Sequence, residues 1–440
     1  MPQLRRELGR WDLTAIGVNQ VIGGAIFAMP ATLAASVGAW SALLVPAVGL
    51  ASMLIAMTFA EVGSRFDATG GPYLYTRAAF GRFLAFEVGW MQWFTRVASW
   101  AAVINVLVVS LGFYWPAVPT DPWRSIVISA LIVALAVINI LGIRQSAWVV
   151  NSLTVGKLLP LLLFIVVGGA VAAPMIGPAS LRAGPAPPLA ELSKSVLLLI
   201  FGLGGYEVVP IPAGESRNPL RDVPFALIMT LTIVTVLYAL IQLVCLATLP
   251  DLAASKTPLI DAAARIAGAS GAAVITLGAV VSTTGNNMGQ VLTGSRALFA
   301  LAEQGDLPRP FAIISRRYNT PVVTIIVTAG VALILATTGS FAIMATASAI
   351  SRLFVSVGTC AAALRLRAPA FAGRVPEPRF RLPLGPSIPV AAILFASAIL
   401  FGATRAQLTG GAAALGAGAV LFLIAALPGR RPGRAGVSFR

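Results

Sequence analysis

Two apolar segments of the sequence are each interrupted near their centre by glycines. The first segment carries Gly23 and Gly24, and the second carries Gly202, Gly204 and Gly205. A helix that breaks inside a membrane leaves backbone amides and carbonyls that are costly to bury without partners. Such breaks therefore persist where protein or a polar cavity receives these groups. A pair of broken helices in one chain indicates the substrate site of a transporter.

The two ends of a broken helix offer binding groups of opposite polarity. The second half begins with exposed amide donors, and the first half ends with exposed carbonyl acceptors. In the first segment, the amides of Gly24 and Ala25 would receive a carboxylate, and the carbonyl of Val21 would face an ammonium. In the second segment, the carbonyls of Phe201 and Gly204 would complete the ammonium site. The alternative is that the glycines only permit close helix packing.

The elements that carry these breaks belong to a helical membrane protein. Of 440 residues, 58% are hydrophobic and 10% are charged, and the mean hydropathy is +0.90. Apolar runs of transmembrane length recur along the whole chain. The first run follows charged residues and offers no small-residue cleavage site that would remove it. We therefore expect the first run to remain as a membrane helix, and we do not interpret it as a signal peptide.

Apolar runs and the Gly, Pro and charged residues between them predict twelve transmembrane helices. Their ranges are about 12–36, 40–63, 83–114, 124–142, 147–173, 193–213, 223–250, 270–301, 321–338, 341–364, 387–404 and 408–428. The connections, among them 65–82, 174–194, 250–269 and 365–386, are too short for a soluble domain. Residues 1–440 should therefore form one integral membrane domain.

The breaks fall in the first and sixth predicted helices, so each half of a ten-helix core would begin with one break. Five helices per half force the second half to enter the membrane from the opposite side. The chain is thus predicted to be a 5+5 inverted repeat, with repeat one at about 12–173, repeat two at about 193–364, and two appended helices at about 387–428. In this arrangement the two breaks meet near the middle of the membrane.

The charges predict an orientation in the membrane. The chain has 31 Lys and Arg against 15 Asp and Glu, and no His. With the N-terminus inside, most basic residues fall in cytoplasmic segments, as the positive-inside rule requires. We expect a multi-pass protein of the inner (plasma) membrane with both termini cytoplasmic. The basic residues should contact anionic lipids, and nucleic acid is not expected as a partner.

The few cysteines and the lack of histidine limit the chemistry that the chain can perform. Cys245 and Cys360 lie in apolar segments, so we expect neither a disulfide framework nor a metal site, and no cofactor. Without histidine, proton coupling would have to use carboxylates, lysine or water. An intramembrane enzyme would need a nucleophile with a base or a metal cluster, which the sequence does not offer. A channel would need a continuous polar pore, whereas polar residues concentrate at one depth.

Four sequence blocks resemble those of the amino acid, polyamine and organocation (APC) superfamily. Residues 16–27 are similar to its first-helix signature, and 60–75 to the end of its second helix with the following loop. Residues 205–224 look like its sixth-helix block, and 295–302 like the end of its eighth helix. The resemblance implies the leucine-transporter fold and amino acid substrates. It also implies proton coupling, sodium coupling or exchange, without choosing among them.

By this resemblance, the α-carboxylate and ammonium of an amino acid would bind at the two breaks. The predicted substrate contacts are Val21, Gly23, Gly24, Ala25, Phe201, Gly202, Gly204, Gly205 and Gln290. Ala25 stands where the superfamily has a later glycine. Alanine keeps the amide donor, but its Cβ narrows the approach to the backbone, so we expect a small substrate head group.

Lys157 lies near the middle of the fifth predicted helix, where an ammonium is costly and usually functional. It resembles the lysine that fills the sodium site in sodium-independent members of the superfamily. We expect its ammonium to bind carbonyls of the first break, such as those of Asn19 and Ile22, and an oxygen of the eighth helix. Burial disfavours the charged amine and the carbonyls favour it, so the group could release and regain a proton. The alternative is a permanently charged structural lysine, as expected in an exchanger.

The eighth predicted helix carries a polar face in an otherwise apolar segment. Ser282, Asn286 and Gln290 recur every four residues and so share one side of the helix. We expect Ser282 or Asn286 near Lys157, and Gln290 near the substrate side chain. Polar residues that only hold helices together are the competing explanation.

Few carboxylates lie within the predicted helices. Glu207 follows the second break and is the second candidate for a proton carrier, unless it pairs with Arg96 or Arg352. The sequence does not separate these roles, nor does it assign one to Glu87. Two other carboxylates, Glu61 and Glu215, lie near arginines at the inner surface, where we expect salt bridges that change with gating.

These observations predict a secondary transporter of amino acids that works by alternating access. Proton-coupled symport of neutral amino acids without sodium is the favoured mechanism, because the predicted pocket has no acidic cluster to receive a cationic side chain. The alternatives are an amino acid exchanger with Lys157 as a static cation, and a transporter of cationic amino acids or polyamines. The expected partners are the substrate, protons and lipids, and the chain could act as a monomer or a homodimer.

Overall fold

The computed structural model describes residues 6–112, 115–174, 185–338, 341–401, 403 and 405–426, and these residues form helices and connecting turns without a β-strand. The α-helices are α1 (Arg10–Val21), α2 (Met29–Val37), α3 (Ser41–Gly63), α4 (Pro72–Phe80), α5 (Arg82–Leu111), α6 (Trp123–Leu141), α7 (Ile143–Ala172), α8 (Leu189–Leu203), α9 (Pro219–Thr248), α10 (Pro258–Glu303), α11 (Val322–Thr338), α12 (Phe341–Arg365), α13 (Ser387–Phe401) and α14 (Arg405–Ala426). The 3₁₀ turns are η1 (Ala25–Phe27), η2 (Gly38–Trp40), η3 (Tyr206–Val208), η4 (Ala213–Glu215), η5 (Leu252–Ala254), η6 (Arg309–Ala312) and η7 (Pro369–Phe371).

The long helices follow the predicted apolar runs closely. Within the described residues, eight helical segments are long and apolar enough to cross a membrane, and α11 and α13 are apolar but shorter. The predicted helix ends at 113–114 and 427–428, and the basic residues at 182 and 430–440, lie outside the described residues. The coarse prediction of an all-helical membrane protein is therefore confirmed.

Two helical stretches lie in segments that we expected to be connections. Helix α4 begins at Pro72, directly after Gly71, whose φ of 50° turns the chain. Helix α10 begins at Pro258, well before its predicted start, and is kinked at Gly268. Proline has no amide hydrogen that needs a partner at a helix start, so Pro72 and Pro258 favour the start of a helix at both positions. Both stretches are too short to span a membrane, which is why the search for apolar runs missed them.

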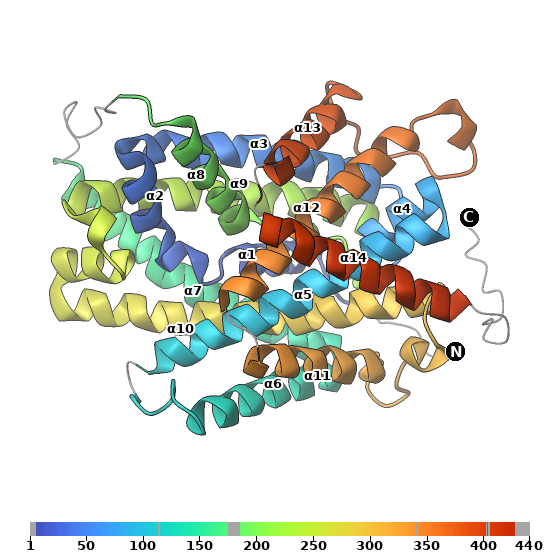
Figure 1. Ribbon diagram of the computed structural model, residues 1–440, viewed down its shortest axis with the longest axis horizontal. Coiled ribbons are helices and arrows are strands. Elements are labelled where there is room, and N and C mark those ends of the chain that lie inside the picture. The colour runs from blue at the N-terminus through green and yellow to red at the C-terminus, as the bar shows by residue number, and fades with distance from the viewer. Residues whose placement is uncertain are drawn as a thin grey trace.

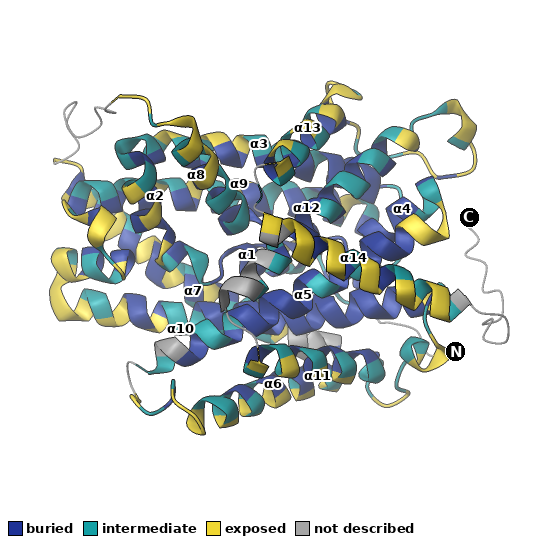
Figure 2. Cartoon of the chain, viewed as in Figure 1, coloured by how far each residue is buried: buried dark blue, intermediate teal, exposed yellow. Residues whose placement is uncertain are grey.

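Most long helices lie side by side and run in similar directions (Figure 1). The short helix α1 lies inside the bundle, where it packs against α7, α9 and α10. Buried residues concentrate along the central helices, including α5 and α10, whereas exposed residues lie on the outer faces (Figure 2). Many of these exposed residues are large and apolar, for example Leu159, Leu394 and Phe401. Apolar outer faces of this kind suit a lipid environment.

Candidate transport site

The first break is an irregular stretch of backbone between α1 and α2. Helix α1 ends at Val21, and Ile22 leaves the helical conformation with φ −78° and ψ 85°. The chain continues through the turn η1, and α2 starts with Pro30 in its first turn. Within the described residues, no group accepts a hydrogen bond from the backbone amide of Gly24 or Ala25. These two amides are therefore available to an anionic group.

The second break follows α8, which ends at Leu203. Gly204 is extended with φ −75° and ψ 151°. Gly205 has φ 133°, a backbone conformation that residues other than glycine rarely adopt. The prediction of a helix that continues to about residue 213 is wrong, because only the 3₁₀ turns η3 and η4 lie between this break and α9. Pro210 and Pro212 lack the amide hydrogens that would continue an α-helix.

The two breaks lie directly against each other. A Cβ on Gly205 would lie 2.7 Å from the backbone carbon and oxygen of Gln20 and 2.8 Å from the Val21 nitrogen. A Cβ on Gly202 would lie 2.7 Å from the sulfur of Met29, so this glycine brings α8 close to the start of α2. Close packing therefore accounts for Gly202 and Gly205. It does not account for Gly24, whose Cβ would make only ordinary contacts at 3.4 Å and beyond.

We expect Gly205→Ala to destabilise the protein markedly. The added methyl group would collide with the Gln20 backbone, and alanine at φ 133° is strained, at a combined cost on the order of 2–4 kcal/mol. Gly169→Ala in α7 is the matched control, because its Cβ would meet nothing within 4 Å. Thermal unfolding of both purified variants checks this prediction. Equal transition temperatures for the two variants would contradict it.

Lys157 links the first break to α10. Its side chain is fully buried, and Nζ donates hydrogen bonds to the carbonyl oxygens of Asn19 at 3.1 Å, Ile22 at 2.6 Å and Ser282 at 3.0 Å. The first two are the carbonyls that the sequence analysis named. One ammonium thus satisfies backbone acceptors that the end of α1 leaves open, and it joins α7 to both α1 and α10.

The polar face of α10 turns toward the backbone of the first break. Ser282 Oγ lies 3.1 Å from the carbonyl oxygens of Ile22 and Gly23, and Asn286 Nδ2 donates to the carbonyl oxygen of Gln20 at 2.9 Å. Gly23 lies against Asn286, since its Cβ would be 3.1 Å from Asn286 Nδ2. These contacts show that this part of the face holds two elements together, the explanation that competed with a cavity lining.

Gln290 lies one turn farther along the same face of α10. Its Nε2 donates to Asn286 Oδ1 at 3.2 Å, whereas its Oε1 is buried and has no partner among the described residues. An unpartnered buried acceptor is costly unless a ligand or water satisfies it. Gln290 is thus the member of this face with an acceptor left for another molecule.

Two residues of this site were missed by the sequence analysis. Gln20 donates from Nε2 to the carbonyl oxygen of Asn286 at 2.9 Å, and Tyr238 of α9 donates from Oη to the carbonyl oxygen of Val21 at 3.2 Å. Gln20 could have been identified from the sequence, because an amide side chain beside Asn19 is unusual in an apolar helix. Tyr238 could not, because nothing in the sequence distinguishes it from a packing residue.

Two of the three carbonyls predicted to face an ammonium, those of Val21 and Phe201, already accept hydrogen bonds within the protein. The Val21 oxygen accepts from the Gly23 amide at 2.9 Å as well as from Tyr238 Oη. The Phe201 oxygen accepts from the Gly204 amide at 3.3 Å, a long hydrogen bond. A substrate ammonium at this place would share these oxygens or replace the weaker donors.

Glu207 pairs with both arginines that the sequence offered as partners. Arg96 Nη2 of α5 donates to Glu207 Oε1 at 2.8 Å, and Arg352 Nε of α12 lies 2.8 Å from the same oxygen. The other oxygen, Oε2, accepts from the Gly205 amide at 2.8 Å. Glu207 thus fixes the second break to α5 and α12, and both of its oxygens are engaged.

The two carboxylates placed near the inner surface are buried, and each forms an ion pair with an arginine. Glu61, at the end of α3, is held by Arg367 through two hydrogen bonds of 2.7 and 2.6 Å. Glu215 accepts from Arg296 Nε at 3.0 Å, and neither side chain of this pair is exposed. Glu87 has no hydrogen-bond partner among the described residues. The pairs expected from the sequence are therefore present, and Glu87 stays unassigned.

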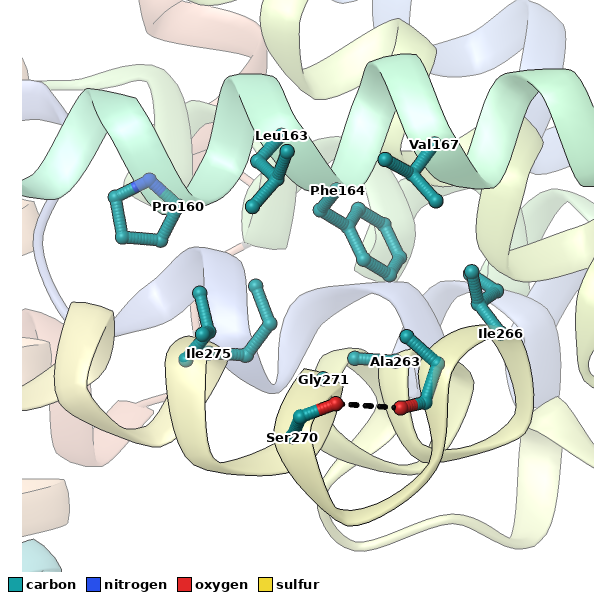
Figure 3. A pocket seen from close by; sticks show the side chains of 11 residues that line it. Pro160, Leu163, Phe164, Val167, Ala263, Ile266, Ser270, Gly271 and Ile275 are labelled. Carbon is teal, nitrogen blue, oxygen red and sulfur yellow. Dashed lines mark hydrogen bonds between the residues drawn. The ribbon is translucent and has the colours of Figure 1, made fainter.

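An apolar cavity of about 150 Å³ lies between α7 and α10 (Figure 3). Its lining is almost wholly apolar, with Pro160, Phe164 and Ile275 among the side chains. The hydroxyl group of Ser270 also lines it, but this group donates its hydrogen bond to the Ala267 carbonyl oxygen. None of the predicted site residues lines this cavity. It lacks the polar groups that an amino acid head group requires, so the breaks remain the candidate site.

Comparison with known proteins identifies the family. A family described as "Amino acid permease" matches residues 8–425. Among similar proteins, the branched-chain amino acid permease BcaP of Bacillus subtilis is 26% identical over 339 residues, which cover 73% of this chain and 72% of the relative. A methylthioribose transporter of Bacillus subtilis is 27% identical, over 88% of this chain and 86% of the relative. Cationic amino acid transporter 4, vacuolar, of Arabidopsis thaliana is 28% identical, over 73% of this chain and 56% of the relative.

The match covers both breaks, Lys157 and the polar face of α10 together. These relatives are transporters and permeases, so the chain is not an enzyme. Its apolar helices agree with a multi-pass membrane protein. The sequence match over nearly the whole length, with a helical structure that places two broken helices in contact, shows that this chain belongs to the amino acid permease family.

Proposed function

We propose that the protein is a secondary transporter that carries neutral amino acids together with protons and without sodium. The observation that carries this proposal is the position of Lys157. Its ammonium lies on carbonyl oxygens of two elements, the first break and α10, as a bound cation would. A chain that supplies this charge itself has no need of a sodium ion there.

Proton coupling follows from the same contacts. While Lys157 is protonated, its three hydrogen bonds hold α1 and α10 together. After deprotonation the amine keeps two hydrogens for three acceptors, so the link between the helices weakens. Opening of the site would then accompany proton release. An exchanger would keep the lysine charged throughout its cycle, and this remains the alternative.

The substrate is proposed to bind where the breaks meet. The free amides of Gly24 and Ala25 would receive the α-carboxylate, and the carbonyls of Val21, Phe201 and Gly204 would receive the ammonium. The open acceptor of Gln290 would contact the rest of the molecule. Charge at both poles of the substrate is thus matched mainly by backbone groups.

A twelve-helix arrangement fits this mechanism. We assign α1 with α2 as the first span and α8 with the turns after it as the sixth, so each five-helix repeat begins with a break. The short helix α4 would lie outside the membrane core, and α13 and α14 would be the appended helices. Both termini would be cytoplasmic, in the inner membrane.

Neutral substrates are favoured by the state of the carboxylate nearest the breaks. Glu207, the carboxylate at the second break, already contacts two arginines and the Gly205 amide. It therefore has no free oxygen for a cationic side chain. The branched-chain relative agrees with this preference, whereas the vacuolar relative represents the cationic alternative.

A thermal-shift screen of all proteinogenic amino acids and polyamines tests the substrate class. A ligand that binds the folded protein raises its apparent stability, by about 2.7 kcal/mol at 100 times Kd. We expect shifts with neutral amino acids. Counterflow in proteoliposomes then tests the carrier mechanism, because unlabelled substrate inside should accelerate uptake of labelled substrate. Shifts with polyamines alone, or flux without counterflow, would contradict the proposal.

A further inference from the structure

Two arginines and one glutamate form a buried charge cluster at the second break. Arg96, Arg352 and Glu207 come from α5, α12 and η3, and their side chains are only 1%, 10% and 4% exposed. Both guanidinium groups lie 2.8 Å from the same carboxylate oxygen. The cluster therefore carries two positive charges against one negative charge, in a region where unbalanced charge is costly.

The hydrogen bonds of the cluster show the same imbalance. Arg96 Nε and Nη1 are buried without a hydrogen-bond partner among the described residues, and Arg352 Nε lies 2.8 Å from Glu207 Oε1 without the alignment of a hydrogen bond. Both oxygens of Glu207 are engaged, one by the arginines and the other by the Gly205 amide. The cluster has spare positive charge and spare donors, but no spare acceptor.

The excess charge lies against the backbone of the proposed substrate site. The space that a Cβ on Gly204 would take is filled by the guanidinium of Arg352. The Gly205 amide binds Glu207, and Gly205 itself packs on the end of α1. Any substrate held at these glycines therefore lies close to Arg352.

We propose that Arg96 and Arg352 determine the charge selectivity of this site by excluding substrates with a cationic side chain. The inference rests on the proposed amino acid transport. The unbalanced positive charge repels a second cation through a poorly screened interior. The arginines also occupy Glu207, the carboxylate that would otherwise receive a cationic side chain. Loss of one arginine would remove the excess charge and free part of that carboxylate.

The test is a gain of function in Arg352→Gln. Transport of a labelled neutral amino acid in proteoliposomes is competed with arginine and lysine, and the ratio of their inhibitory concentrations to that of the unlabelled neutral substrate is measured. We expect the ratio to fall roughly tenfold or more in this variant, since tenfold corresponds to about 1.4 kcal/mol. The wild type should show weak competition by both cations.

Two control variants separate charge from shape. Arg352→Lys keeps the positive charge and should keep the exclusion of arginine and lysine. Arg352→Gln combined with Glu207→Gln removes the carboxylate and should lose the gain. Arg96→Gln removes the same charge from α5, so it provides a second test if Arg352→Gln does not fold.

The possible outcomes distinguish this inference from the function on which it rests. A wild type that transports no amino acid would contradict the proposed function. A wild type that transports neutral amino acids, with folded Arg352→Gln and Arg96→Gln that still exclude arginine, would overturn the inference alone. Strong competition by arginine in the wild type would overturn it as well.

Discussion

Lys157→Ala should abolish the accumulation of substrate driven by a proton gradient. The change removes the ammonium from three buried carbonyl oxygens and leaves the link between α1 and α10 without a titratable group. The protein should still fold, because Asn286 Nδ2 at 3.3 Å and Ser282 Oγ at 3.1 Å can still donate to the Asn19 and Ile22 carbonyls. The lost hydrogen bonds should lower stability by about 1–3 kcal/mol. Uptake against an imposed pH gradient in proteoliposomes is the measurement.

Lys194→Ala is the matched control for the loss of a lysine. Its side chain is 69% exposed and forms an ion pair with Glu191, so we expect uptake at the wild-type level. Sodium should have no effect on wild-type uptake. An alanine variant at position 157 that still accumulates substrate with protons, or a wild type that requires sodium, would defeat the proposed coupling.

Gly24→Val should abolish substrate binding in a protein that remains folded. The branched side chain would occupy the place where the free amides of Gly24 and Ala25 are proposed to receive the carboxylate. The fold should survive, because a Cβ at this position would lie 3.4 Å from Val106 and 3.7 Å from Thr283, which are ordinary contacts. We expect affinity to fall at least about 100-fold, equivalent to about 2.7 kcal/mol. Isothermal titration of the purified variant measures this loss.

Gly24→Ala gives the matched control for this substitution. A single methyl group fits the available space, so this variant should bind substrate with a smaller loss than the valine variant. A thermal transition close to that of the wild type would show that Gly24→Val is folded. Wild-type affinity in Gly24→Val would remove this glycine from the site.

The helices could be predicted from the sequence because their ends are marked by residues with a definite backbone effect. Helix α9, for example, begins at Pro219 and ends before Pro250, close to the predicted range. The predicted end of the sixth helix was wrong. Its composition remains apolar beyond Gly205, and hydropathy alone does not register that Pro210 and Pro212 remove the amides that an α-helix needs.

The contacts of Lys157 were expected from the resemblance to sodium-independent members of the superfamily, whereas the sequence left the role of Glu207 open. An ammonium in the middle of an apolar helix must find oxygen acceptors, and a broken helix supplies unpaired carbonyls. Glu207 instead had three possible roles in the sequence. The choice depends on how α5 and α12 are rotated toward the second break, and tertiary packing sets that rotation.

The most direct test of the account measures uptake of a neutral amino acid by the wild type in sodium-free proteoliposomes. An inward proton gradient is imposed, and the internal substrate concentration is followed with and without a protonophore. We predict accumulation above the external concentration, collapse of that accumulation with the protonophore, and no increase when sodium is added. Accumulation that requires sodium, or uptake that occurs only in exchange for internal amino acid, would contradict the assignment of Lys157 as the site of proton coupling.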